Sequence, residues 1–289
     1  MKTVIGIGEI LWDMLPEGKV LGGAPANFAY HAMQLGAEGV AISAIGNDEL
    51  GQEIVKIIEE ENVVNALHIS NKPTGTVGVE LNNGIPSYTI YEDVAWDNIK
   101  LTDVAKEKLV KADAVCFGSL AQRSKVSRKA IWEALALVPE SCIKVFDINL
   151  RQHFYSKEVI EKSLEFADVF KINEEEIEIF RTMFGMEGTE EELCAQVVDQ
   201  YNLRLLTLTK GSEGSLLMAK DEKSFIPTPK VKVADTIGAG DSFTATMVMG
   251  LLYEQPLTAL HQKAVDVSAF VCTNNGATPL LPEKLKYKL

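Results

Sequence analysis

Residues 235–241 read D-T-I-G-A-G-D and are followed directly by an apolar run, residues 242–252. The pattern predicts a glycine-rich turn and then a helix start, where unpaired backbone N–H groups and a partial positive charge suit an anion. The carboxylate of Asp241 would repel a bound phosphate, so its presence needs a separate reason. We predict that Asp241 faces a hydroxyl group that attacks the phosphate, which indicates phosphoryl transfer. An ordinary helix cap after a glycine-rich turn is the alternative that the spacing leaves open.

A second glycine-rich run, G-G-A-P-A-N, covers residues 22–27 and precedes a helical pattern. Its two glycines let a backbone approach a ligand closely. The amide of Asn27 offers both a donor and an acceptor, which suits the hydroxyl groups of a polyol. The alternative interpretation is a turn that only leads into a helix.

Other nucleotide and hydrolase motifs are incomplete or missing from the sequence. Residues 6–11 begin like a dinucleotide-binding fingerprint, but the third glycine position is Leu11 and no helical pattern opens there. The Walker, H-E-x-x-H and G-x-S-x-G patterns are absent. The histidines are scattered, and we predict structural or surface roles for His31, His68, His153 and His261.

The composition is that of a globular enzyme for small molecules. The 289 residues are 46% hydrophobic and 24% charged, which is enough for a sizeable core. The net charge of -13 argues against a nucleic-acid-binding surface, but not against a nucleotide substrate. The four cysteines form no C-x-x-C pair, and no signal-peptide pattern or membrane-length apolar run is present. We therefore expect a cytoplasmic protein with buried thiols and with no nucleic-acid or membrane partner.

A regular α/β framework must position these motifs. Short apolar runs alternate with amphipathic segments, which predicts a mostly parallel sheet with helices on both sides. The strand-like runs are residues 4–7, 39–45, 114–117, 143–147, 169–172 and 205–209. The helical patterns are residues 26–34, 51–61, 128–137, 157–166 and 190–201. The ends of these strands are where open α/β sheets bind ligands.

One region departs from this alternation. Residues 77–91 alternate on both sides of an Asn83-Gly84 pair, which predicts an antiparallel hairpin, and residues 9–21 can supply a neighbouring strand. We predict a small β lid over the substrate, built from about residues 10–22 and 70–96. An ordinary edge hairpin is the alternative. Exposed lid edges invite pairing with a second chain, so a homodimer through the lid is a further prediction.

With both glycine-rich motifs in view, the chain resembles the ribokinase-like, pfkB-type carbohydrate kinases from Gly6 to Pro282 and in the same order. Residues 8–13 and 22–27 are most similar to the fructokinase branch, since the ribokinase branch has a Lys-Gly pair in place of Ala24-Pro25. The resemblance implies one domain over residues 1–289, a three-layer α/β sandwich with a mostly parallel central sheet and a small antiparallel β lid.

The resemblance also implies roles for the two glycine-rich motifs. Asp241 matches the base that accepts the proton of the sugar hydroxyl. The anion hole that steadies the transferred phosphoryl group matches Gly238, Ala239 and Gly240. Positions that hold the sugar hydroxyls match Asp13, Gly23 and Asn27.

Further matches concern the nucleotide and its metal ion. Asn173 and Glu176 match an Asn-x-x-Glu motif that organises Mg²⁺ and phosphate, largely through water, and their oxygens suit a hard cation. The loop beside the phosphates and ribose of ATP matches Thr209, Lys210, Gly211 and Gly214. A helix cap is the alternative for the Asn-x-x-Glu segment.

Arg151 belongs to a D-x-N-x-R segment, residues 147–151, that faces the cleft in the family. Its guanidinium can bind an anionic group in a bidentate manner, and a surface ion pair is the alternative. The family often uses a potassium ion behind the anion hole. The backbone carbonyls of Asp235, Ile237 and residues 271–276 are the candidate ligands, but Leu280 stands where some members have a serine.

The sequence thus predicts an ATP-dependent sugar kinase that uses Mg²⁺ and, as a further expectation, K⁺. We expect transfer of the γ-phosphate to a primary hydroxyl of a free sugar, with D-fructose giving fructose 6-phosphate. Ribose and 2-keto-3-deoxygluconate are the alternative substrates, the second because Arg151 can meet its carboxylate. A non-catalytic sugar-binding sensor on a kinase scaffold is the alternative from another class. The presence of Asp241 and the glycines favours the kinase.

Overall fold

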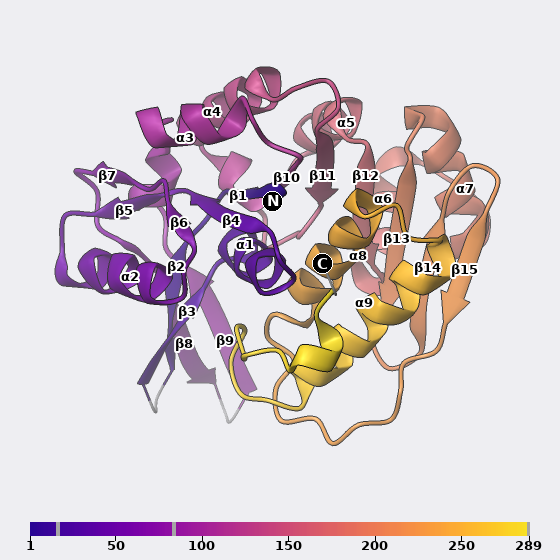
Figure 1. Ribbon diagram of the computed structural model, residues 1–289. Helices are drawn as coiled ribbons and strands as arrows, with labels where there is room; N and C mark the ends of the chain where they lie inside the picture. Colours follow the sequence, from indigo (N-terminus) through magenta and orange to yellow (C-terminus); the bar gives the residue numbers. More distant parts are fainter. Residues whose placement is uncertain (16–17, 83–84, 288–289) are drawn as a thin grey trace.

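The computed structural model describes residues 1–15, 18–82 and 85–287. A nine-stranded sheet forms its centre, in the order β15-β14-β13-β12-β11-β10-β1-β4-β6 (Figure 1). The strands from β6 to β13 along this order run parallel, and β14 and β15 form an antiparallel edge. Their bounds are β1 Thr3–Ile7, β4 Glu38–Ile42, β6 Val64–Asn65, β10 Ala114–Gly118, β11 Ile143–Asp147, β12 Val169–Asn173, β13 Leu205–Lys210, β14 Gly214–Met218 and β15 Lys223–Ile226. The predicted mostly parallel sheet is confirmed.

Helices cover both faces of this sheet, which gives three layers. Helices α1, α8 and α9 pack on one face, and α3 to α7 pack on the other. Successive strand residues alternate between the two cores, so that Val145 faces the first set and Phe146 the second. The helices are α1 Ala24–Gln34, α2 Glu49–Glu60, α3 Asp103–Leu109, α4 Lys125–Leu137, α5 Lys157–Phe166, α6 Glu174–Phe184, α7 Glu190–Tyr201, α8 Ala239–Leu252 and α9 Leu257–Cys272.

A second, four-stranded sheet lies beside the central one, in the order β3-β2-β8-β9 (Figure 1). Its strands are β2 Leu11–Leu15, β3 Gly18–Gly22, β8 Gly75–Asn82 and β9 Ile85–Ile90. The predicted hairpin and the neighbouring strand are confirmed, although the Asn83-Gly84 turn itself lies outside the described residues. The two hairpins are antiparallel, whereas β2 and β8, which are distant in the chain, pair in parallel.

Shorter elements connect these layers. Strands β5 (Ala44–Gly46) and β7 (His68–Ser70) form a two-stranded sheet. The 3-10 helices are η1 Ala95–Asn98, η2 Leu120–Arg123 and η3 Glu283–Leu285. The four cysteines are free, and three of them are buried. Within the part of the chain that the structure describes, no helix combines the length and the apolar character needed to cross a membrane.

Candidate active site

The two glycine-rich motifs meet in space. Helix α8 starts after Gly238, which has a left-handed φ of 76°. Asn27 lies in the first turns of α1, and its Nδ2 donates a hydrogen bond of 2.8 Å to Oδ2 of Asp241. The motifs are 214 residues apart in the chain, so only the fold brings them together. The fold therefore places Asn27 and Asp241 in direct contact.

Glycines make this meeting sterically possible. A Cβ on Gly6 would lie 1.8 Å from the carbonyl oxygen of Pro25, so α1 can rest on β1 only because that position lacks a side chain. Gly23 has a φ of 121°, and a Cβ there would lie 2.5 Å from the carbonyl oxygen of Glu9. A Cβ on Gly238 would lie 2.5 Å from the carbonyl oxygen of Ala277. These glycines bring protein backbones together, a role distinct from ligand contact.

A buried ion pair lies under the start of α8. Asp147 and Lys171 are register partners on β11 and β12, and the Lys171 Nζ lies 3.1 Å from Oδ1 of Asp147. Both side chains are about nine-tenths buried, with exposed fractions of 10% for Lys171 and 9% for Asp147. Burial opposes the charge of Lys171, but Asp147 and Glu176 outweigh burial and raise the pKa of the ammonium group. Lys171 thus stays a cation in the interior.

The surroundings of Asp241 make its carboxyl group a weaker acid than an exposed aspartate. Burial raises the pKa of Asp241 to about 6, the hydrogen bond from Asn27 opposes that change, and the negative charge of Asp147 adds to it. A carboxyl group with this pKa is ionised near neutral pH and still accepts a proton readily. That combination suits a general base.

Asp13 and Arg151 lie on the same side of the site. Asp13 is on β2, and Gly22 leaves room for it, because a Cβ there would lie 2.7 Å from its Oδ2. Burial raises the pKa of Asp13, and the positive charge of Arg151 opposes the change, as it does for Asp241. The exposed Arg151 therefore faces an acid-rich surface that includes two of the predicted site residues.

Asn173 and Glu176 form a complete capping box at the start of α6. Asn173 Oδ1 accepts hydrogen bonds from the N–H groups of Glu175 and Glu176, at 2.9 and 2.8 Å. Glu176 accepts from the N–H of Asn173 through Oε2 and from the N–H of Leu150 through Oε1, both at 2.9 Å. The helix cap, which was the alternative interpretation of this segment, is thus present. The Mg²⁺ role of these residues stays a prediction, and no cluster of three or more His, Cys, Asp or Glu side chains suited to a metal occurs in the described ranges.

The predicted nucleotide loop joins β13 to β14. Thr209 is the register partner of Asn173, which places this loop beside the start of α6. Gly211 and Gly214 have φ values of 45° and 145°, so the tight turn requires glycine at both positions. The ammonium group of Lys210 is bound to Glu190 and Glu213, at 2.8 and 3.1 Å. Lys210 is therefore turned toward α7 and its own loop.

Asp235 joins the two loops that the potassium prediction names. Its Oδ1 accepts hydrogen bonds from the N–H groups of Thr236 and Ile237, and its Oδ2 accepts one of 3.1 Å from Gly276. The N–H of Ala234 also donates to the Cys272 carbonyl, at 2.8 Å. The two loops lie side by side, while the ion itself stays a prediction.

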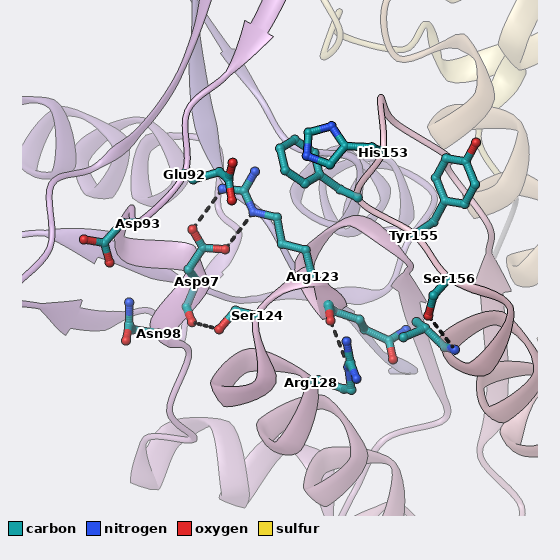
Figure 2. A pocket seen from close by; sticks show the side chains of 13 residues that line it. Glu92, Asp93, Asp97, Asn98, Arg123, Ser124, Arg128, His153, Tyr155 and Ser156 are labelled. Carbon is teal, nitrogen blue, oxygen red and sulfur yellow. Dashed lines mark hydrogen bonds and ion pairs between the residues drawn. The ribbon is translucent and has the colours of Figure 1, made fainter.

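A cavity lies elsewhere, between η1, η2 and the loop before α5. It measures about 480 Å³ (Figure 2). Arg123 forms its wall and donates to both carboxylate oxygens of Asp97, at 2.8 and 2.9 Å, and to the Tyr91 carbonyl at 2.6 Å. Its guanidinium stacks on Trp96 and Phe154, with 3.8 and 4.4 Å to the ring centroids. This group ties the end of β9 to the central layers.

Sequence reasoning missed two buried residues near Asp241. Lys171 was hidden inside an otherwise apolar strand, although a charged residue between Phe170 and Ile172 is a usable signal for a buried ion pair. Glu9 was part of longer segments, including residues 8–13 that resemble the fructokinase branch, but no role was assigned to its side chain. It is 3% exposed and lies within the site.

Comparisons with known proteins agree with this geometry. Residues 17–284 match the pfkB family of carbohydrate kinases. An uncharacterised sugar kinase of Pyrococcus horikoshii is 31% identical over 99% of this chain and 95% of its own length. Its crystal structure in complex with ATP superposes with a TM-score of 0.81 over 95% of this chain and 94% of that one.

Two fructokinases are also similar over nearly the whole chain. Fructokinase-1 of Zea mays is 26% identical, covering 97% of this chain and 95% of its own. The fructokinase of Vibrio cholerae O395, solved with fructose, ADP and calcium, is 25% identical with a TM-score of 0.80, covering 98% of this chain and 96% of its own. The resemblance to the family and the ribokinase-like α/β fold are confirmed, and the chain belongs to the pfkB family of carbohydrate kinases.

Proposed function

We propose that this protein phosphorylates a free sugar with ATP, and that its sugar is D-fructose, converted to fructose 6-phosphate. The observation that carries the proposal is the 2.8 Å contact between Asn27 and Asp241, which brings an amide suited to a polyol at the start of α1 against a candidate base at the start of α8. Two similar proteins are named fructokinases, and one similar sugar kinase was crystallised with ATP, which supports the choice of both substrates.

The proposed chemistry uses the residues as they lie. Asp13, Asn27 and Arg151 orient the sugar so that its primary hydroxyl faces Asp241 and the γ-phosphate. As the hydroxyl oxygen bonds to the γ-phosphorus, its proton passes to the Asp241 carboxylate and ADP departs. Most of the acceleration comes from positioning and from fixed charge.

Backbone groups at the start of α8 take the developing negative charge. The first N–H groups of a helix have no partner within the helix, so those of Gly238, Ala239 and Gly240 are candidates for the anion hole. The N–H of Ala239 makes a long contact of 3.3 Å with the Thr236 carbonyl, which an anion can replace. Lys171 lies close beneath, since a Cβ on Gly240 would be 3.6 Å from its Nζ. We propose that its charge supports this anion hole.

Asn173 and Glu176 fit a magnesium ion that keeps its water shell. Both oxygens of Glu176 and the Oδ1 of Asn173 already accept backbone N–H groups, so these residues would hold the ion through its water molecules. When bound, the ion would neutralise phosphate charge.

The loop that contains Thr209, Gly211 and Gly214 would border the nucleotide, and the side chain of Lys210 would lie at one side of it. The carbonyls of Asp235, Ile237 and residues 271–276 are the proposed ligands of a potassium ion, and the hydrogen bonds of Asp235 to both loops support this choice.

The second sheet is proposed as a lid, since β2 carries Asp13 into the site. Its outer strands, β3 and β9, are proposed to form a homodimer interface by edge pairing. The buried, unpaired thiols support a cytoplasmic location.

Arg151 bears on the choice of sugar. Its charge already compensates the acidic groups Asp13, Glu9 and Asp241. A sugar acid would bring another negative charge to this surface, so the balance favours a neutral sugar over 2-keto-3-deoxygluconate.

A panel of free sugars with Mg-ATP, scored by ADP release, tests the proposal. We expect D-fructose to show the highest kcat/KM, above D-ribose and 2-keto-3-deoxygluconate. A higher value for another sugar would transfer the assignment to that sugar. Sugar binding without ADP release from any member of the panel would identify a non-catalytic sensor.

A further inference from the structure

Three polar side chains lie buried on one face of α1. They are Asn27, His31 and Gln34, with exposed fractions of 5%, 0% and 6%. Residues three or four positions apart lie on the same side of a helix, so the three form one row. Asn27 binds Asp241, as described above. The other two bind an irregular segment that follows α9, residues 276–281.

This irregular segment is held by side chains. Nε2 of His31 lies 2.8 Å from the carbonyl oxygen of Ala277. The amide of Gln34 donates to the Pro279 carbonyl at 3.0 Å and accepts from the N–H of Leu281 at 3.1 Å. Within the described ranges, no backbone-to-backbone hydrogen bond involves the segment. The contacts from α1 are therefore a main determinant of where its backbone lies.

The same segment supports the turn that precedes α8. The Ala277 carbonyl oxygen, which His31 contacts, is also the atom nearest to the Cβ position of Gly238, at 2.5 Å, and the Ala277 Cα follows at 2.7 Å. Gly238 is the N-cap of α8 and has a left-handed φ of 76°. The backbone of Ala277 thus packs directly on Gly238, whose conformation sets where the first N–H groups of α8 point.

The imidazole of His31 acts as a neutral donor. A carbonyl oxygen only accepts hydrogen bonds, so Nε2 carries the proton in this contact. Burial lowers the pKa of His31 to about 4, which keeps the ring neutral near pH 7. Its Nδ1 is buried and has no hydrogen-bond partner among the described residues. A buried acceptor without a partner costs folding free energy, so an apolar side chain would fill this space at lower cost, and the donor at Nε2 is what the imidazole adds.

We propose that His31 is a positioning residue for the phosphoryl transfer. This inference rests on the proposed kinase function. Asn27 fixes the carboxylate of Asp241, while His31 fixes the turn at Gly238 through the Ala277 carbonyl. Both contacts start from one face of α1, so this helix holds the base and the anion hole at a constant separation. Such positioning matters most in the transition state, where the N–H donors must meet the charge on the transferred phosphoryl group.

Steady-state kinetics of His31→Leu and His31→Gln test the inference, with Mg-ATP and the sugar of highest turnover in the panel. His31→Leu removes the donor, so we expect kcat to fall by about 10–10²-fold while both KM values change by less than about twofold. The side-chain nitrogen of glutamine reaches about as far as Nε2 of histidine, so His31→Gln should keep most of the wild-type kcat. Equal losses of kcat in the two variants, or a wild-type kcat in His31→Leu, would overturn the inference.

His261→Leu is the matched control, because His261 is also fully buried. Its two ring nitrogens each lie 2.8 Å from a hydroxyl group, those of Ser215 on β14 and Ser224 on β15. We expect this variant to lose stability and to keep the wild-type kcat per folded molecule. A loss of kcat as large as that of His31→Leu would reduce the role of His31 to fold stability and reject the positioning.

Hydrogen–deuterium exchange gives a readout that needs no turnover. The N–H of Ser242 donates to the Gly238 carbonyl at 2.9 Å, and the N–H of Leu281 donates to Gln34, so the two report on the start of α8 and on the segment. Both should exchange faster in His31→Leu and at the wild-type rate in His31→Gln and His261→Leu. If His31→Leu does not fold, His31→Asn replaces it, because the shorter amide falls short of the Ala277 carbonyl.

The exchange result separates this inference from the kinase assignment. Faster exchange at both sites in a protein that phosphorylates no sugar would uphold the support of Gly238 by His31 and reject the kinase. An unchanged exchange rate of the Ser242 N–H in the variant that lacks the donor would reject the positioning role, whatever its kcat.

Discussion

Arg123 and Lys171 are both buried cations paired with an aspartate, yet their surroundings differ. Arg123 binds Asp97 in a bidentate manner and is enclosed by the rings of Trp96 and Phe154. Lys171 makes one contact of 3.1 Å with Asp147 and stands among further carboxyl groups. The first pair holds both carboxylate oxygens of its aspartate. The second pair, Lys171 and Asp147, belongs to a cluster in which acidic groups outnumber the cations beside them.

This difference separates a structural clamp from a reactive site. A bidentate pair with ring stacking fixes the end of β9. Burial, to which nearby carboxylates add, raises the pKa of Glu9 to about 7 and that of Asp241 to about 6, which costs stability but creates groups that can gain or lose a proton at working pH. The large cavity lies beside the clamp, and the acidic cluster has only a small one. Cavity size alone would therefore not point to the cluster that contains Asp241.

The largest expected effect is on the reactive cluster. Asp241→Asn should lower turnover by about 10²–10⁴-fold and leave ATP binding largely intact, because the amide cannot accept the proton. Steady-state kinetics and nucleotide titration measure both quantities. Asp113→Asn, which removes a carboxylate bound to Lys2 at 2.9 Å, is the control and should keep near-normal turnover. Near-normal turnover in Asp241→Asn would remove Asp241 from the mechanism.

Removing the cation of the cluster should destabilise the fold. Lys171→Met leaves Asp147 buried without its partner, and we expect a loss of about 3–5 kcal/mol in the free energy of unfolding. Urea denaturation measures the loss. Lys144→Met is the control, since Lys144 and Asp168 are 3.8 Å apart at a more exposed position, and should cost less than about 1 kcal/mol. Equal losses for the two variants would contradict the contrast drawn above.

Stability and activity should respond oppositely to pH. Because the folded pKa of Asp241 is raised from 3.8 to about 6, its favourable contribution is complete below pH 3.8 and is lost as the pH rises through 6. Activity needs the ionised form and rises over the same window. We expect the stability of the wild type relative to Asp241→Asn to fall by on the order of 2 kcal/mol between pH 4 and 7. Thermal unfolding of both proteins across this range checks the sign, and a rise would refute it.

The smallest expected effect concerns the clamp. Arg123→Lys keeps the charge but loses the bidentate contact and the stacking on Trp96 and Phe154, so we expect a loss of about 1–2 kcal/mol. The pH profile of turnover should stay as in the wild type. A shifted profile, measured with the same sugar and ATP, would show that the clamp and the reactive cluster are coupled.

The α/β framework could be predicted from the sequence, and the two glycine-rich motifs could be recognised in it, because strands and close backbone contacts each leave local signals. Buried parallel strands produce apolar runs, and close backbone approach leaves glycines such as Gly23 and Gly238. The parallel pairing of β2 with β8 left no local signal, because it joins distant segments. Lys171 and Glu9 were missed for a related reason: their importance depends on which charges the fold places beside them, and spacing along the chain does not report that.

The most direct test of the kinase assignment is ³¹P NMR of the products formed from ATP and D-fructose. We predict a phosphate monoester on the sugar C6 oxygen, formed in equal amount to ADP by the wild type and at a greatly reduced rate by Asp241→Asn. ADP with only inorganic phosphate, a phosphate on another oxygen of the sugar, or equal rates for the two proteins would contradict the account.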